Sequence, residues 1–70
     1  MTSNYTLLNY HLNSMVELLI KKFGSQYDEA LPIVMSTQTY KMLVDKPFLL
    51  EEGKLFVQEL LDREISLRAA

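Results

Sequence analysis

Hydrophobic side chains recur at steps of three and four residues near the start of the chain, which is the spacing of one face of an α-helix. This face consists of Tyr5, Leu8, Leu12, Met15, Val16, Leu19, Ile20 and Phe23. Ser3 or Asn4 can accept a hydrogen bond from the first backbone N–H groups of such a helix. Gly24 follows the last of these residues and can adopt the left-handed conformation that ends a helix. The pattern therefore predicts a first helix over residues 5–23.

A second, shorter helix is expected over residues 26–35. Its inward face would consist of Tyr27, Ala30, Leu31 and Val34. Ser25 can cap its start, and Asp28 and Glu29 place negative charge in the first turn, where the helix dipole favours it. Pro32 lies inside the segment and removes one backbone hydrogen bond, so the sequence predicts either a kink or a break there.

The next segment predicts a third helix over residues 37–45, capped by Ser36. Its inward side chains would be Tyr40, Leu43 and Val44. The helix should end at Lys46, because a residue that precedes a proline avoids the helical conformation. The three apolar residues after Pro47 form a connector that we expect to pack beneath the last helix; they are Phe48, Leu49 and Leu50.

The last helix should begin at Gly53 or Lys54, with Glu52 as its cap, and run to about Leu67. Its buried stripe would consist of Phe56, Val57, Leu60, Leu61 and Leu67. No segment alternates between polar and apolar residues for long enough to predict a strand. The sequence therefore predicts one all-α domain, a compact bundle of three to four helices with no sheet. Its core should include Leu12, Leu19, Tyr27, Leu31, Tyr40, Leu43, Val57, Leu60 and Leu61.

Charge, the length of the apolar runs and the lack of cysteine argue against several classes of protein. The net charge is −2 and the pI about 5.2, whereas a general nucleic-acid binder normally has a basic face. No apolar run approaches the roughly 20 residues of a membrane-spanning helix. The N-terminal residues do not pair a basic segment with an apolar core, so no secretory signal is predicted and a cytoplasmic location is expected. The chain has no cysteine, which excludes disulfides and thiolate metal sites.

An enzyme needs reactive groups that converge on a pocket, and the sequence offers few of them. His11 is the single histidine, and no phosphate-binding motif is present. The adjacent carboxylates Asp28–Glu29 and Glu51–Glu52 point in different directions if they lie on helices. We therefore expect a protein that is not an enzyme, with no metal, cofactor or small-molecule substrate.

The first helix is unusual because residues 1–16 contain no Asp, Glu, Lys or Arg. Helices on small soluble proteins usually carry charges on their solvent-facing side. Beside the main apolar face, a second line of residues at steps of four and seven consists of Leu7, His11 and Leu18, and Ser14 lies near this line. This line predicts an interface with a second copy of the chain or with another protein. The alternatives are that another helix of the same chain covers it, or that the leucines are simply exposed.

Residues 28–44 also allow a different interpretation, a helix-turn-helix that binds DNA. Thr37, Gln38 and Lys41 would then lie on its second helix and contact phosphates or bases. Against this hypothesis, Pro32 interrupts the first helix, and Val34–Met35 lies in the turn where glycine is typical.

Three segments carry a resemblance to a group of short uncharacterised bacterial helical proteins. They are Tyr27–Leu31, Ser36–Leu43 with its S-x-x-T-Y-x-x-L spacing, and Phe56–Leu61. The resemblance spans roughly residues 15–65 and implies a small bacterial helical domain, some relatives of which are encoded beside putative toxin genes. It carries over no catalytic residue. Together with the first helix, it predicts a cytoplasmic protein that acts by protein–protein contact, as a homodimer or as an accessory subunit of an operon-encoded partner.

Overall fold

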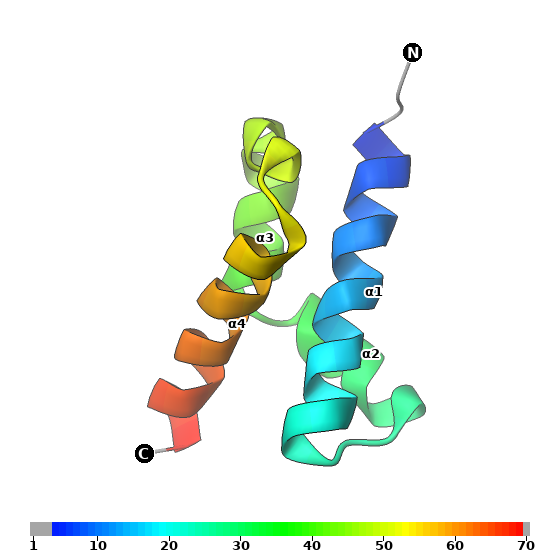
Figure 1. The fold of residues 1–70 in the computed structure, drawn as a ribbon, viewed down its shortest axis with the longest axis vertical. Coiled ribbons are helices and arrows are strands. Elements are labelled where there is room, and N and C mark those ends of the chain that lie inside the picture. The colour runs from blue at the N-terminus through cyan, green and yellow to red at the C-terminus, as the bar shows by residue number, and fades with distance from the viewer. Residues whose placement is uncertain (1–3, 70) are drawn as a thin grey trace.

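The computed structural model describes residues 4–69 and contains helices without any strand in this range (Figure 1). In chain order the elements are α1 (Asn4–Phe23), α2 (Tyr27–Met35), α3 (Gln38–Asp45), the 3-10 helix η1 (Pro47–Glu51) and α4 (Lys54–Ala69). The predicted all-α bundle is confirmed. Each predicted helix is present, and the connector after the third helix forms one additional short turn of its own.

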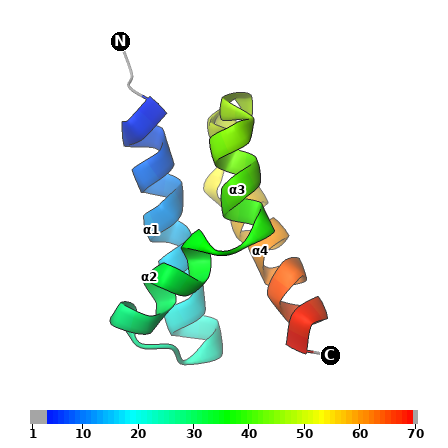
Figure 2. The same cartoon turned by 180° about the vertical axis from the view of Figure 1, so that it is seen from behind.

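The helices form two groups that pack against each other, α1 with α2 and α3 with α4. Figures 1 and 2 show α1 on one side and α3 with α4 on the other, while α2 crosses the lower half of α1. In the chain, α1 packs against every other element, and α3 packs against both η1 and α4. The prediction that the connector after Pro47 packs beneath the last helix is wrong. This connector, η1, packs against α1 and α3, and its Leu50 is buried there.

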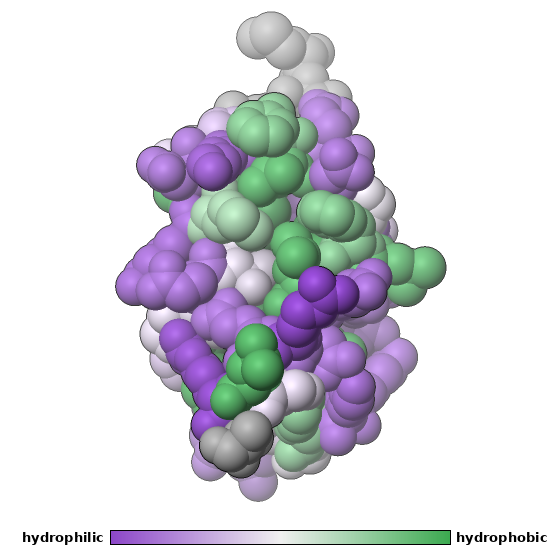
Figure 3. Space-filling view, turned by 90° about the vertical axis from the view of Figure 1, so that its left-hand side faces the viewer, coloured by the Kyte–Doolittle hydropathy of each residue, from purple (hydrophilic) through white to green (hydrophobic). Residues whose placement is uncertain are grey.

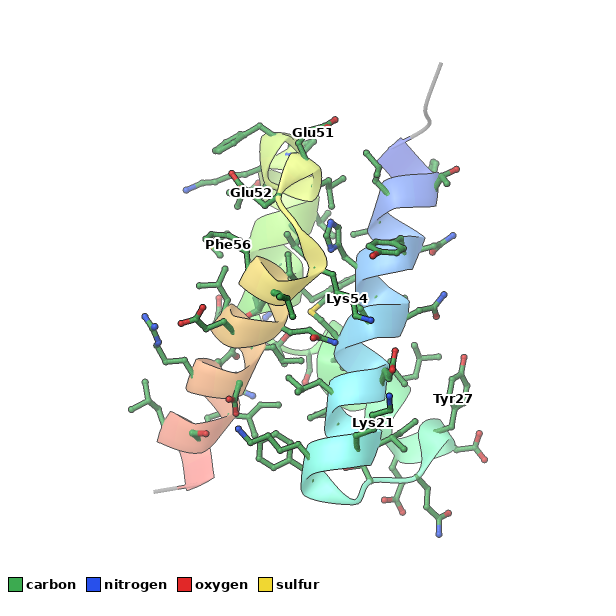
Figure 4. The ribbon with its side chains drawn as sticks, in the orientation of Figure 1. Lys21, Tyr27, Glu51, Glu52, Lys54 and Phe56 are labelled. Atoms are coloured by element: carbon green, nitrogen blue, oxygen red, sulfur yellow. The ribbon has the colours of Figure 1, made fainter. Side chains whose placement is uncertain are left out.

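The core takes side chains from every element. Its buried members are Met15, Val16, Leu19, Ala30, Val34, Leu43, Leu50, Val57 and Leu61. Among the other predicted core residues, Leu12, Leu31, Tyr40 and Leu60 are half-buried. Tyr27 is a wrong prediction, since its side chain is 56% exposed. It is the first residue of α2 and points outward at the margin of the molecule, where no helix covers it (Figure 4).

Helix ends follow local backbone chemistry, with small shifts from the predicted caps. Gly24 has φ 71°, and the Ser25 N–H reaches back to the Leu19 carbonyl, so the predicted left-handed stop of α1 is confirmed. Ser25 does not cap α2. The helix begins at Tyr27, so Gln26 is in the capping position, and its side chain makes no capping hydrogen bond. Pro32 lies inside a continuous α2, so the chain does not break there.

The start of α3 lies one residue later than predicted. Thr37, rather than Ser36, is its cap, and the Thr37 hydroxyl accepts a hydrogen bond from the Tyr40 N–H at 3.1 Å. The Ser36 hydroxyl instead donates to the Ile33 carbonyl at the end of α2. Both residues can cap a helix, and the turn that leaves α2 decides which one does.

The buried stripe of α4 is rotated from the predicted one. Val57 and Leu61 are fully buried, and Ile65 packs against the same core. Phe56 and Leu67, both predicted to be buried, are exposed, as are Tyr5, Ile20 and Phe23 of the predicted first-helix face. Side chains of adjacent residues on a helix point in directions about 100° apart. Because the side of α4 that carries Val57 faces α1 and α3, the neighbouring Phe56 points toward solvent.

Candidate functional site

The line predicted as an interface on α1 lies mostly inside the chain. His11 and Ser14 are buried, and Leu7 and Leu18 are half-buried against the core. The expectation that this line faces outward is therefore wrong for His11 and Ser14. The side of α1 that carries them is covered by η1 and α4 of the same chain, which was one of the alternatives open from the sequence.

Hydrogen bonds explain why these two polar residues are buried. The His11 Nε2 atom lies 2.8 Å from the Leu50 carbonyl oxygen, and because that oxygen only accepts, Nε2 carries the proton. The Ser14 hydroxyl donates to the His11 carbonyl at 2.9 Å, and Gln58 of α4 donates to the Ser14 carbonyl at 2.8 Å. The His11 Nδ1 atom is buried without a hydrogen-bond partner among residues 4–69. The line thus joins α1 to η1 and α4.

The residues of the DNA-binding hypothesis lie in two different environments. Thr37 is fully buried, and its hydroxyl is used twice, as the cap of α3 and as a donor to the Val34 carbonyl at 2.6 Å. Gln38 and Lys41 are exposed and line an open hollow of about 670 Å³ beside α3, together with the charged residues Asp45 and Lys46. The structure therefore brings Gln38 and Lys41 together on one surface, but not Thr37.

The N-terminus of α3 is occupied by Glu64 of α4, a residue that the sequence analysis did not single out. Its carboxylate accepts hydrogen bonds from the Gln38 N–H, the Thr39 N–H and the Thr39 hydroxyl, each at 2.8 Å. Arg68 lies 3.1 Å from the same carboxylate. Only the Glu64–Arg68 spacing was visible in the sequence; the contact with α3 comes from the tertiary structure.

Electrostatics keep Glu64 ionised. Partial burial favours the neutral acid, but the hydrogen bonds from Gln38 and Thr39, with the charge of Arg68, outweigh burial. The pKa of Glu64 therefore lies below its ordinary value of 4.5. A carboxylate thus takes the place at the start of α3 where a DNA phosphate would accept the same N–H groups.

Two further ion pairs hold α1 to α4. Lys22 lies 2.6 Å from Asp62, and Lys54 lies 3.8 Å from Glu17. Glu17 also accepts a hydrogen bond from Lys21 at 2.6 Å, and this bond with the two lysine charges holds the pKa of Glu17 below its usual range. All of these charges are at least partly exposed, so they orient the helices more than they stabilise them.

Uncovered apolar residues gather at η1 and the first turn of α4. Phe48 is 69% exposed, Leu55 78% and Phe56 43%; we call these three residues the η1–α4 apolar face. Figure 3 looks onto the side toward which Phe56 points in Figure 4 and shows hydrophobic side chains gathered over its upper half, with hydrophilic ones around them. Glu52 points to the same side (Figure 4).

A shallow groove lies between the start of α1, the end of α3 and η1. It has a volume of about 200 Å³. Its lining consists of Tyr5, Leu8, Leu43, Val44, Pro47 and Leu50. Pro47, which lines the groove, directly precedes Phe48 in η1. Open apolar surface of this kind is typical of contact sites rather than of enclosed substrate sites.

Over the described residues, no cluster of three or more histidine or carboxylate side chains could hold a metal ion. Within the same range, no helix combines the length and the apolar character that crossing a membrane requires. The chain matches no protein-family model, no curated protein and no solved structure.

Proposed function

We propose that this chain is a non-catalytic domain that acts through contact with another protein, and that the η1–α4 apolar face is its contact surface. The observation that carries the proposal is the exposure of two aromatic side chains and a leucine, Phe48, Phe56 and Leu55, on adjoining elements. Isolated exposed apolar residues are common on protein surfaces, but aromatic residues that gather on one face are enriched at interfaces.

The proposed contact surface lies on η1 and α4 instead of on α1, where the sequence had predicted an interface. Because His11 and Ser14 pack inside the chain, they offer no surface to a partner. The proposed partner is either a second copy or the product of a neighbouring gene. The resemblance to short bacterial helical proteins supports the further expectation of a bacterial, cytoplasmic accessory subunit.

Two features weigh against DNA binding as the function. Glu64 already accepts the hydrogen bonds of the Gln38 and Thr39 N–H groups at the start of α3. The hollow beside α3 has two lysines, Lys41 and Lys46, and one carboxylate, Asp45, so its basic excess is small compared with the row of basic residues that phosphate contacts normally use.

Photo-crosslinking in the cell tests the proposal. A photoreactive phenylalanine analogue would replace Phe48 in one variant and Tyr27 in a control variant, since Tyr27 is also an exposed aromatic residue but lies on α2. We expect a discrete adduct with a protein chain from position 48 and none from position 27. Equal labelling from both positions, or none from position 48, would contradict the proposal.

A further inference from the structure

A hydrogen bond from His11 attaches η1 to α1. The His11 Nε2 atom donates to the Leu50 carbonyl oxygen at 2.8 Å, and both residues are buried. Within η1 only Leu50 and its neighbour Leu49 are shielded from solvent, and both pack against the core. The attachment of η1 therefore depends on these two apolar side chains and on the bond from His11.

The second ring nitrogen of His11 decides which protonation state fits this place. Nδ1 is buried and has no hydrogen-bond partner among residues 4–69. In the neutral ring that donates from Nε2, Nδ1 carries only a lone pair, whereas the imidazolium carries an N–H group on both nitrogens. Protonation would thus bury a positive charge and an N–H group without an acceptor, and both are unfavourable away from water.

Among the described residues, no carboxylate forms an ion pair with His11. Glu51 and Glu52 at the end of η1 are exposed, and Glu52 points away from α1 (Figure 4). Lys54 of α4 points toward α1, where it lies 3.8 Å from Glu17, and its charge has the same sign as an imidazolium. Beyond Lys54, charged residues of α4 form ion pairs of their own. The charged residues of α2 and α3, and the one before η1, are exposed; they are Asp28, Glu29, Lys41, Asp45 and Lys46.

We propose that His11 is an acid-sensitive switch, and that proton uptake by its ring releases η1 from α1. In the released state the ring is in water, which solvates the charge, so this state binds the proton more readily than the attached state does. The attachment is therefore fully present at neutral pH. It weakens as the pH falls below about 6.5, where an exposed histidine takes up its proton.

Release would change the groove between α1, α3 and η1. Leu43 of α3 and Leu50 of η1 both line this groove, so the departure of η1 uncovers apolar surface that is closed at neutral pH. Each pH unit below about 6.5 should raise the equilibrium constant for release up to about tenfold, since one proton is taken up. Glu17 and Glu64 do not contribute in this range, because the pKa of each carboxyl lies below 4.5.

A single introduced cysteine can measure the release, because the chain has none of its own. Leu50→Cys replaces a buried side chain of η1 and keeps the backbone carbonyl that accepts the bond from His11. Its labelling by dithiodipyridine, divided by the rate for a free thiol, should rise about tenfold from about pH 7.5 to about pH 5.5. The matched chain also carries His11→Gln, whose amide can donate but does not titrate, and its labelling should not depend on pH.

Val57→Cys provides the second comparison, since Val57 is buried in α4 and a cysteine there becomes reactive only when the bundle opens. Position 50 should be labelled faster than position 57 at both pH values. Equal rates at the two positions would show that η1 is released only by unfolding and would overturn the proposal. So would labelling at position 50 that does not change with pH, or that changes equally in the His11→Gln chain.

The wild-type chain gives an independent test without a substitution. Ring ¹⁵N signals of His11 at neutral pH should show a proton on Nε2 and none on Nδ1. A proton on Nδ1 instead, or a charged ring at about pH 5.5 while the amide signals of η1 keep their neutral-pH positions, would refute the switch.

Discussion

Replacing Glu64 by alanine should cost about 2–3 kcal/mol of unfolding free energy, although Glu64 is not one of the buried core residues. The substitution leaves the Gln38 N–H, the Thr39 N–H and the Thr39 hydroxyl without their acceptor. Loss of a capping side chain costs about 0.5–2 kcal/mol, and a hydrogen bond to a charged group contributes about 1.5–3 kcal/mol. Water can reach part of the vacated site, so the effects do not add fully. For a domain of this size the loss corresponds to a decrease in Tm of about 8–24 °C.

The same contact predicts how stability depends on pH. Because the pKa of Glu64 is lower in the folded state than its ordinary value of 4.5, the unfolded chain binds its proton more readily. The contribution of Glu64 is therefore fully present at neutral pH. It begins to decrease as the pH approaches 4.5, and it is lost as the pH falls further, through the lower pKa of the folded state.

Urea unfolding followed by circular dichroism, at neutral pH and at several acidic pH values, measures both effects. Glu64→Gln keeps the shape of the side chain and should show the largest deficit from wild type at neutral pH, with a smaller deficit in acid. The matched control is Glu59→Gln, which removes an exposed α4 carboxylate paired with Arg63 at 3.3 Å and should change stability by less than about 0.5 kcal/mol. Equal losses for the two variants, or a Glu64 deficit that does not depend on pH, would refute the reasoning.

Three further predictions use the same unfolding measurement. Leu61→Ala should cost about 2–5 kcal/mol because Leu61 is fully buried, and Leu60→Ala should cost less because Leu60 is half-buried; the reverse order would show that the helix is rotated. Gly24→Ala should cost about 1–2 kcal/mol because its φ is 71°, whereas Gly53→Ala, with equally open surroundings and no positive φ, should be nearly neutral. His11→Phe should cost about 1–3 kcal/mol, since it leaves a buried carbonyl oxygen of η1 without a donor, and an unchanged stability would argue against this bond.

The helices themselves could be predicted from residues that are close together in the chain. The three- and four-residue spacing of apolar side chains, the glycine after Phe23 and the proline after Lys46 locate α1, α3 and the start of η1 within one or two residues. The ends of the helices were less certain, because Ser36 and Thr37 are both good caps. The turn that leaves α2 selects Thr37.

The candidate site could be predicted only in part. The charge-free start of the chain led to an expected interface on α1, but η1 returns to cover that surface, and Leu50 accepts the bond from His11 across 39 positions. In α4, Phe56 and Leu60 alternate with Val57 and Leu61, so two adjacent faces are equally apolar. The periodicity cannot show which of them is buried.

Local sequence thus determined that this chain forms helices, where each lies to within one or two residues, and that its core is apolar without disulfides. Only the tertiary structure decided which side of each helix is covered, and therefore that Phe56 lies at the surface while His11 is inside. It also placed Glu64 at the start of α3, across 25 positions. The physical reason is that capping and helical spacing depend on neighbours within about one turn of a helix. Burial, in contrast, depends on which distant segments pack against a helix, and a helix with apolar residues on two sides is compatible with more than one packing.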